Sequence, residues 1–79
     1  MSVEKTISAA QCRAGRALIK LTQAGLAEAA SISKSVVVDF ENDHRVPNRN
    51  NLAAIRRVLE GAGVVFIDDG SPGVRLRSG

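Results

Sequence analysis

The 79-residue sequence predicts a mainly α fold of four to five short helices, followed by a short C-terminal β-hairpin. Three observations support this prediction. Apolar residues recur at helical spacing between residues 9 and 62. Residues that favour helix N-caps precede several of these segments. After Gly63, a β-forming run and a segment rich in turn residues replace the helical pattern.

The first two helices are expected over residues 9–20 and 23–30. Ser8 is suited to cap the first helix, and Thr22 is suited to cap the second, because a hydroxyl oxygen can accept an unpaired first-turn amide. The apolar positions expected to share one face of the first helix include Ala10, Ala14, Ala17, Leu18 and Leu21. Ala27, in the second helix, is small where a neighbouring helix must come close.

A third helix is expected over residues 34–42, with Ser33 as its cap and with Val37 and Phe40 on one face. The β-branched run at 36–38 is also compatible with a strand. We interpret it as helix because the segment is short, begins with a capping residue and directly follows another helix.

A loop over residues 43–48 and a fourth helix over 49–62 complete the helical part. Pro47 favours an extended conformation at the residue before it. The apolar stripe of the fourth helix consists of Leu52, Ile55 and Leu59. Gly63 can adopt the left-handed conformation that commonly ends a helix.

The C-terminal hairpin is predicted from two β-forming runs, 64–67 and 74–77, that flank turn residues. An isolated hairpin is only marginally stable, so this one must either pack on the helices or pair with a second copy of the chain. The expected organisation is a flexible N-terminus (1–7), a helical domain (8–63) and a strand appendage that is a candidate dimer contact (64–79).

Charge is unevenly distributed along the chain. The net charge is +3, but residues 11–57 hold eight basic and four acidic residues and therefore carry +4. A basic helical part is expected if it meets a polyanion, although a solvated basic surface gives the same pattern. Phe40 and Phe66 are the only aromatic residues, which argues against binding of single strands by base stacking.

Other classes of protein find little support. Cys12 is the only cysteine and His44 the only histidine, so neither a disulfide nor a Cys/His metal site is expected. Asp68 and Asp69 are neighbouring carboxylates in a turn, and no glycine-rich phosphate loop precedes a helix. We expect no enzymatic activity and no cofactor. The sequence shows no signal peptide and no membrane-spanning run, so a cytoplasmic protein without a membrane partner is expected.

The combined spacing of several residues resembles the Cro and phage-repressor type of helix-turn-helix regulators (XRE family). These residues are Arg16, Gln23, Leu26, Ala27, Ser33, Val37, Phe40, Glu41, Pro47, Leu52 and Leu59. The resemblance covers about residues 11–62 and implies a repressor-like helix-turn-helix domain. It also implies a transcriptional regulator that binds double-stranded DNA sequence-specifically and reads the major groove with helix 34–42.

The resemblance suggests which residues contact DNA. Helical geometry turns Ser35, Val38 and Asp39 outward when the apolar positions of their helix face the core. The resemblance implies that Lys34, Ser35 and Asp39 contact base edges, and Val38 can meet a thymine methyl group. The implied phosphate-contacting residues are Gln23, Asn42, Arg45, Asn48 and Arg49. Arg16 and Glu41 are implied to form a structural ion pair.

Two departures from the family pattern stand out. Ser31 and Asp43 occupy positions where the family often has glycine, and both positions are expected to need a left-handed backbone. In addition, residues 34–39 contain no Arg, Gln or Asn to read a base in bidentate fashion. The same face is therefore also compatible with a regulatory protein partner, as in an antiactivator or an antitoxin-like protein.

The expected assembly is a homodimer on a palindromic operator, because one helix of this kind covers only a few base pairs. The apolar strand 64–67 is the candidate contact between copies. The alternative is that this strand only covers the helices of its own chain.

Overall fold

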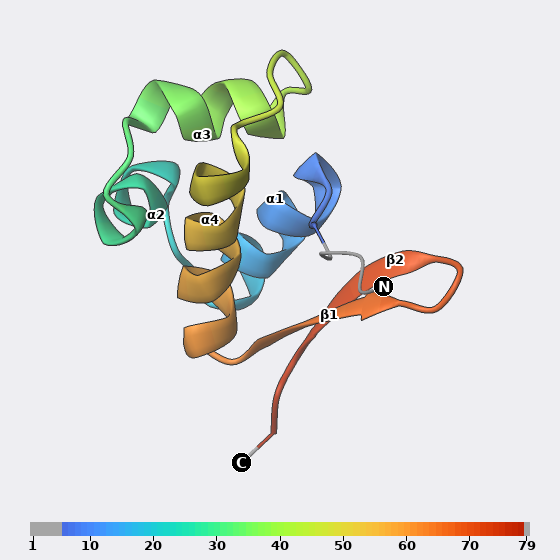
Figure 1. Ribbon diagram of the computed structural model, residues 1–79. Coiled ribbons are helices and arrows are strands. Elements are labelled where there is room, and N and C mark those ends of the chain that lie inside the picture. The colour runs from blue at the N-terminus through green and yellow to red at the C-terminus, as the bar shows by residue number, and fades with distance from the viewer. Residues whose placement is uncertain (1–5, 79) are drawn as a thin grey trace.

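The computed structural model describes residues 6–78 and confirms a mainly α fold with a C-terminal two-stranded antiparallel sheet. The elements are α1 (Ala9–Leu18), α2 (Gln23–Ala30), α3 (Lys34–Glu41), α4 (Arg49–Gly61), β1 (Val64–Asp68) and β2 (Pro72–Leu76). Figure 1 shows α3 lying across one end of the molecule, with the hairpin extending from the side of the helical part. The flexible N-terminus expected over 1–7 falls mostly on residues 1–5, which lie outside the described residues.

The start of α1 is fixed by a capping box, as the sequence predicts for Ser8. The Ser8 Oγ accepts the Gln11 amide at 3.1 Å, and the Gln11 Oε1 accepts the Ser8 amide at 2.9 Å. Ile7, just before the cap, is buried in the core together with Cys12. An apolar residue that precedes a helix cap commonly packs against that helix, which accounts for the burial of Ile7.

The other helices begin at polar caps, but not all in the same way. The Thr22 Oγ1 accepts a first-turn amide of α2 at 2.9 Å. The Asn48 Oδ1 does the same for α4 at 2.8 Å. Ser33 precedes α3 with an extended backbone, but its side chain makes no cap bond, and its Oγ lies 3.1 Å from the Ser35 Oγ. Ser33 is thus the N-cap residue of α3, as predicted, but its hydroxyl pairs with a neighbouring hydroxyl and not with a first-turn amide.

Left-handed residues follow the first three helices. The expected left-handed backbone is present at Ser31 (φ 59°) and Asp43 (φ 60°), and it also occurs at Lys20 (φ 56°). Beyond each helix an amide donates to a carbonyl five residues earlier, as the Leu21 amide does to Arg16 O at 2.9 Å. This turn explains why α1 ends at Leu18 and not at the expected residue 20.

The buried face of α1 differs from the prediction. The residues buried on α1 are Ala9, Gln11, Cys12 and Gly15. Leu18, expected in the apolar stripe, is instead 39% exposed. Gly15 lies where Leu59 of α4 and Val64 of β1 approach this face closely. A Cβ added to Gly15 would lie 3.3 Å from Val64 Cγ1.

The core joins all four helices and the first strand. Its buried apolar residues are Ile7, Ala9, Cys12, Leu26, Ala27, Ala30, Val37, Phe40, Ile55, Leu59 and Val64. Val37 and Phe40 attach α3 to this core, so the opposite side of α3 is left outside it. The run at 36–38 is helical, as predicted.

The hairpin pairs in a regular antiparallel register, with Val64 opposite Leu76 and Ile67 opposite Gly73. It is attached to α1 by the Gln11 side chain, whose Nε2 donates to Ile67 O at 3.3 Å and to Gly73 O at 3.1 Å. The buried Val64 adds an apolar contact with the core. The hairpin therefore packs on the helices of its own chain. None of the helices described over residues 6–78 has the length and apolar character to cross a membrane.

Candidate nucleic-acid interface

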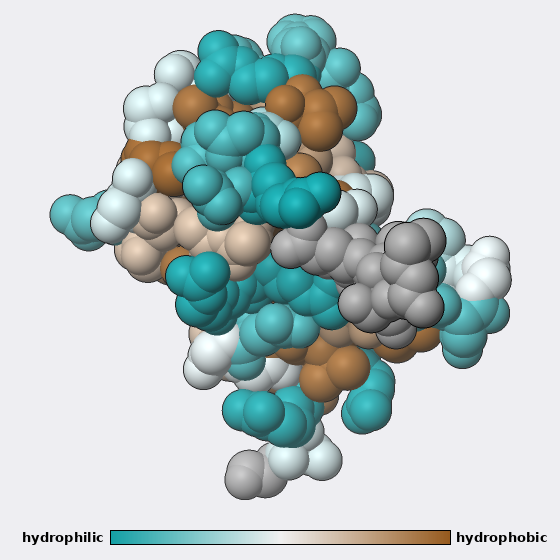
Figure 2. All heavy atoms as spheres, in the orientation of Figure 1, coloured by the Kyte–Doolittle hydropathy of each residue, from teal (hydrophilic) through white to brown (hydrophobic). Residues whose placement is uncertain are grey.

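The outer side of α3 presents a mixed polar and apolar surface. Lys34 and Ser35 are exposed, whereas Val38 and Asp39 are half-buried. Asn42 follows at the C-cap and is exposed. In Figure 2 the end of the molecule that carries α3 shows hydrophilic residues with apolar ones between them. All four residues expected to contact bases thus retain some exposure on this helix.

The loop after α3 folds back along the last turn of the helix. The His44 amide donates to Asp39 O at 2.8 Å, and the left-handed Asp43 makes this return possible. The Arg45 Nη2 then lies 3.5 Å from Asp39 Oδ2. Val46, the next residue, is 83% exposed. The carboxylate expected to accept from a base is therefore paired with a guanidinium expected to contact a phosphate.

Three of the five expected phosphate contacts lie at the starts of two helices. Gln23 is the first residue of α2, and Arg49 is the first residue of α4. The amides at helix starts carry partial positive charge, which suits an anion. Asn48 is exposed, but its Oδ1 already caps α4. Gln23 is half-buried, and its Nε2 donates to Glu41 Oε1 at 3.1 Å.

Arg16 and Glu41 form a bidentate ion pair beneath α3. The Arg16 Nη2 lies 2.6 Å from Glu41 Oε1, and the Arg16 Nε lies 2.7 Å from Glu41 Oε2. The side chain of Glu41 is only 1% exposed. Arg16 also donates to the Leu21 carbonyl at 2.9 Å. This pair fastens α3 to α1 and to the turn that follows α1.

Two further residues of α1 belong to this cluster, and neither was expected there from the sequence. The Cys12 Sγ donates to Glu41 Oε2 at 3.1 Å. Arg13 donates from Nη1 to the Glu41 carbonyl. The spacing of four residues between Cys12 and Arg16 places both on one helix face, which is the signal that could have identified the thiol.

The ionisation of the cluster follows from its burial and hydrogen bonds. Burial alone raises the pKa of Glu41, but hydrogen bonds from Arg16, Cys12 and Gln23 outweigh it, and the pKa lies below its ordinary value. Hydrogen bonding to Glu41 raises the pKa of Arg16. Burial, together with the neighbouring carboxylate, raises the pKa of the Cys12 thiol. Glu41 is therefore ionised and the thiol protonated at neutral pH.

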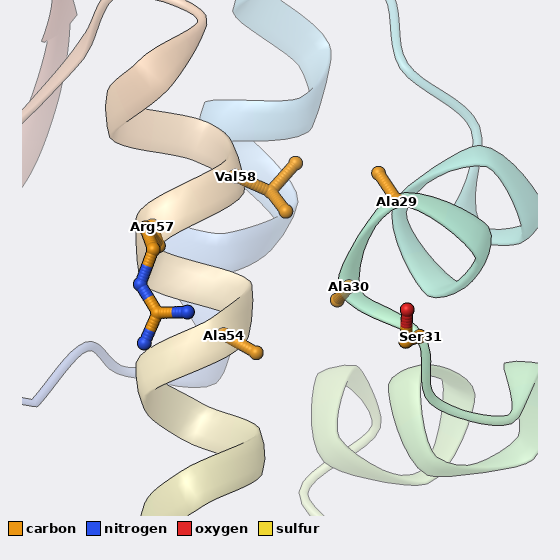
Figure 3. A pocket seen from close by; sticks show the side chains of 6 residues that line it. All are labelled: Ala29, Ala30, Ser31, Ala54, Arg57 and Val58. Atoms are coloured by element: carbon orange, nitrogen blue, oxygen red, sulfur yellow. The ribbon is translucent and has the colours of Figure 1, made fainter.

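A depression between α2 and α4 lies apart from the surface of α3 (Figure 3). The residues lining it are Ala29, Ala30, Ser31, Ala54, Arg57 and Val58. Its walls are mostly small apolar side chains, and Arg57 brings the only charged group among them. Within residues 6–78, no three His, Cys, Asp or Glu side chains are grouped so that they could hold a metal ion.

Comparisons with known proteins agree with this geometry. A family model described as "Helix-turn-helix" matches residues 13–62. No curated protein matches the chain. Among solved structures, the chain is similar to the DNA-binding domain of the P22 C2 repressor, determined by nuclear magnetic resonance in solution. That match has a TM-score of 0.64 and 26% identity, and it covers 73% of this chain and 76% of the other.

Proposed function

Because the chain belongs to the helix-turn-helix family, as a regulator of the Cro and phage-repressor type, we propose that it binds double-stranded DNA sequence-specifically and regulates transcription. The observation that carries the proposal is the position of α3. Its apolar side is fixed in the core, its outer side stays outside the core, and Gln23 at the start of α2 bonds to Glu41 of α3. The proposed activity is binding, without catalysis.

The outer side of α3 is proposed to read the major groove, which is wide enough to admit one helix. Lys34 can donate to guanine, and Ser35 can donate or accept. Val38 can contact a thymine methyl group, and Asp39 can accept from the amino group of cytosine. The exposure of these side chains supports this assignment, since none of them is fully buried by the protein itself.

Phosphates are proposed to bind on both sides of the groove, at Gln23 on one side and at Arg49 with Asn48 on the other. Asn42 and Arg45 extend the second of these contacts. Such contacts fix the position of the protein on the duplex but do not distinguish sequences. The side-chain amide of Gln23 has two N–H groups on Nε2. The bond to Glu41 uses one of them, so the other remains available to a phosphate.

We further propose that the protein acts as a homodimer on a two-fold symmetric site, through hairpin residues 64–77. The hairpin is anchored to α1, yet Leu76 on its second strand remains 47% exposed. A two-fold contact there would place two copies of α3 on one duplex. A palindromic recognition sequence is the expected consequence.

One observation favours a second candidate, a regulatory protein partner of the antiactivator or antitoxin-like kind. Val46 is 83% exposed in the loop after α3, and Val38 lies half-buried on the outer side of that helix. An aliphatic surface of this kind suits a protein contact. A salt titration separates the two candidates, because DNA binding through several phosphates weakens by orders of magnitude between low and moderate salt.

Selection of duplexes from a random pool tests the main proposal. We expect one palindromic motif, whereas a single half-site would contradict the dimer. Lys34→Ala and Ser35→Ala should relax the base preference, each by a factor of roughly 5 to 150 at one position. Arg49→Ala should weaken binding to all sequences alike and lower the salt slope by about 1. The site assignment is wrong if all three variants select the parent motif with the parent affinity.

A further inference from the structure

We propose that Asp39 and Arg45 together discriminate between the recognition site and all other DNA. The inference rests on the proposed function and specifies how its sequence preference arises. In the free protein the two side chains neutralise each other. On the recognition site they separate, so that Asp39 binds a base and Arg45 binds a phosphate.

The geometry shows a pair that is held in place but not locked. The Asp39 carbonyl accepts the His44 amide at 2.8 Å, which brings the loop back over the last turn of α3. The guanidinium of Arg45 then lies 3.5 Å from the carboxylate, beyond a strong hydrogen bond. The two side chains are 48% and 36% exposed. Exposed pairs of this kind are weak, so separating this one costs little.

On a mixed-sequence duplex the pair weakens binding whether Arg45 stays with Asp39 or moves to a phosphate. If Arg45 stays with Asp39, the protein loses one phosphate contact. If Arg45 moves to a phosphate, an unpaired carboxylate remains in a groove surrounded by phosphates, and wherever the facing base pair does not place its amino group toward Asp39, no donor compensates that charge. Lys34, at the opposite end of α3, is too early in the helix to replace Arg45 beside the last turn.

The recognition site removes this conflict. An exocyclic amino group in the major groove donates a hydrogen bond to Asp39, and cytosine N4 is the usual donor to a carboxylate. Arg45 is then released to a phosphate, and the complex gains one contact that the non-specific complex lacks. Asp39 therefore determines specificity partly by penalising the wrong sequences, and Arg45 couples that penalty to backbone binding.

The experiment measures the affinity of the whole chain for its selected duplex and for a mixed-sequence duplex, between about 50 and 200 mM salt. Asp39→Asn keeps the shape of the side chain but removes its charge. We expect this variant to bind mixed DNA more tightly, to lose roughly tenfold of its specificity ratio and to lose its preference for cytosine at one position. Arg45→Ala should lower the salt slope on the selected duplex by about 0.9, with a smaller decrease on mixed DNA.

Glu60→Gln is the matched control, since it makes the same change of charge in another exposed pair. The Glu60 Oε2 lies 3.0 Å from the Arg56 Nε on α4, away from α3. This variant should bind both duplexes slightly more tightly and leave their ratio unchanged. A thermal melt of each variant verifies that the fold is intact.

The outcomes separate the two proposals. If the parent chain selects no duplex, the proposed function fails, and this inference fails with it. If the parent selects a motif but Asp39→Asn keeps the specificity ratio of Glu60→Gln, the function stands and the discriminating pair is refuted. If the parent chain prefers adenine, and not cytosine, at the position that Asp39→Asn affects, the contact to an amino group stands and its donor is adenine N6.

Discussion

Two arginine–carboxylate pairs are attached to α3, and they differ in almost every physical respect. Arg16 and Glu41 meet at 2.6 Å beneath the helix, where the carboxylate is 1% exposed. Arg45 and Asp39 meet at 3.5 Å on the opposite side, where both side chains are partly open to solvent. The buried pair has two parallel bonds and several further donors, and the exposed pair has a single long contact.

The difference shows how one short helix can be both fixed and adaptable. A buried charge that loses its partner is costly, so the inner pair keeps α3 in one position. An exposed pair contributes at most about 1 kcal/mol, so its members are available to other partners. Charges of the same kind thus have a structural role on one side of α3 and a proposed binding role on the other.

The largest expected effect comes from breaking the buried pair. Glu41→Ala removes the acceptor for Arg16 and Cys12 and leaves a cation that is largely shielded from water. We expect the free energy of unfolding, measured by urea denaturation at neutral pH, to fall by about 3 to 5 kcal/mol.

Replacing both partners by apolar residues, as in Arg16→Met with Glu41→Leu, should restore most of that loss, because no buried charge is then left alone. A double variant as unstable as Glu41→Ala would show that the cluster contributes more than the avoidance of an unpaired charge. In that case, part of the stability attributed to the buried pair would come from the packing of α1 against α3.

Acidification should remove the contribution that the buried pair makes to stability. The pKa of Glu41 is lower in the folded chain than the ordinary value of about 4.3. Its contribution is therefore complete above about pH 4.3 and is lost as the pH falls through the lower folded pKa. Urea denaturation from pH 6 downward should show this loss, and Glu41→Gln should have a flatter profile. Equal slopes for the two proteins would assign the acid sensitivity elsewhere.

The sequence predicts the local features of the fold well. The order and type of the six elements and the cap at Thr22 follow from short-range chemistry, whereas the left-handed residues Ser31 and Asp43 were expected from the family resemblance. The elements and the cap depend on residues within about one turn, which the sequence displays directly. The family resemblance extends the same information to the crossing of α2 and α3.

Features that depend on distant residues were not predictable in the same way. The buried face of α1 was misassigned because alanine, glycine and cysteine give a weak periodic signal. The polar Gln11 is buried because it bonds to Ile67 and Gly73, more than fifty residues away in the chain. Similarly, the contact between Asp39 and Arg45 arises from the return of a loop, and spacing alone does not reveal it.

The smallest expected effect completes the comparison. Asp39→Ala, Arg45→Ala and their combination should each change the free energy of unfolding by less than about 0.5 kcal/mol, because an exposed pair gains little over its separate interactions with water. A double-mutant cycle by urea denaturation measures the coupling within the pair directly. A coupling above about 1 kcal/mol would mean that the pair is too stable to open on DNA, and the contrast with Arg16 and Glu41 would disappear. A small coupling, together with a large loss of sequence discrimination in Asp39→Asn, would place the role of the outer pair in binding and not in folding.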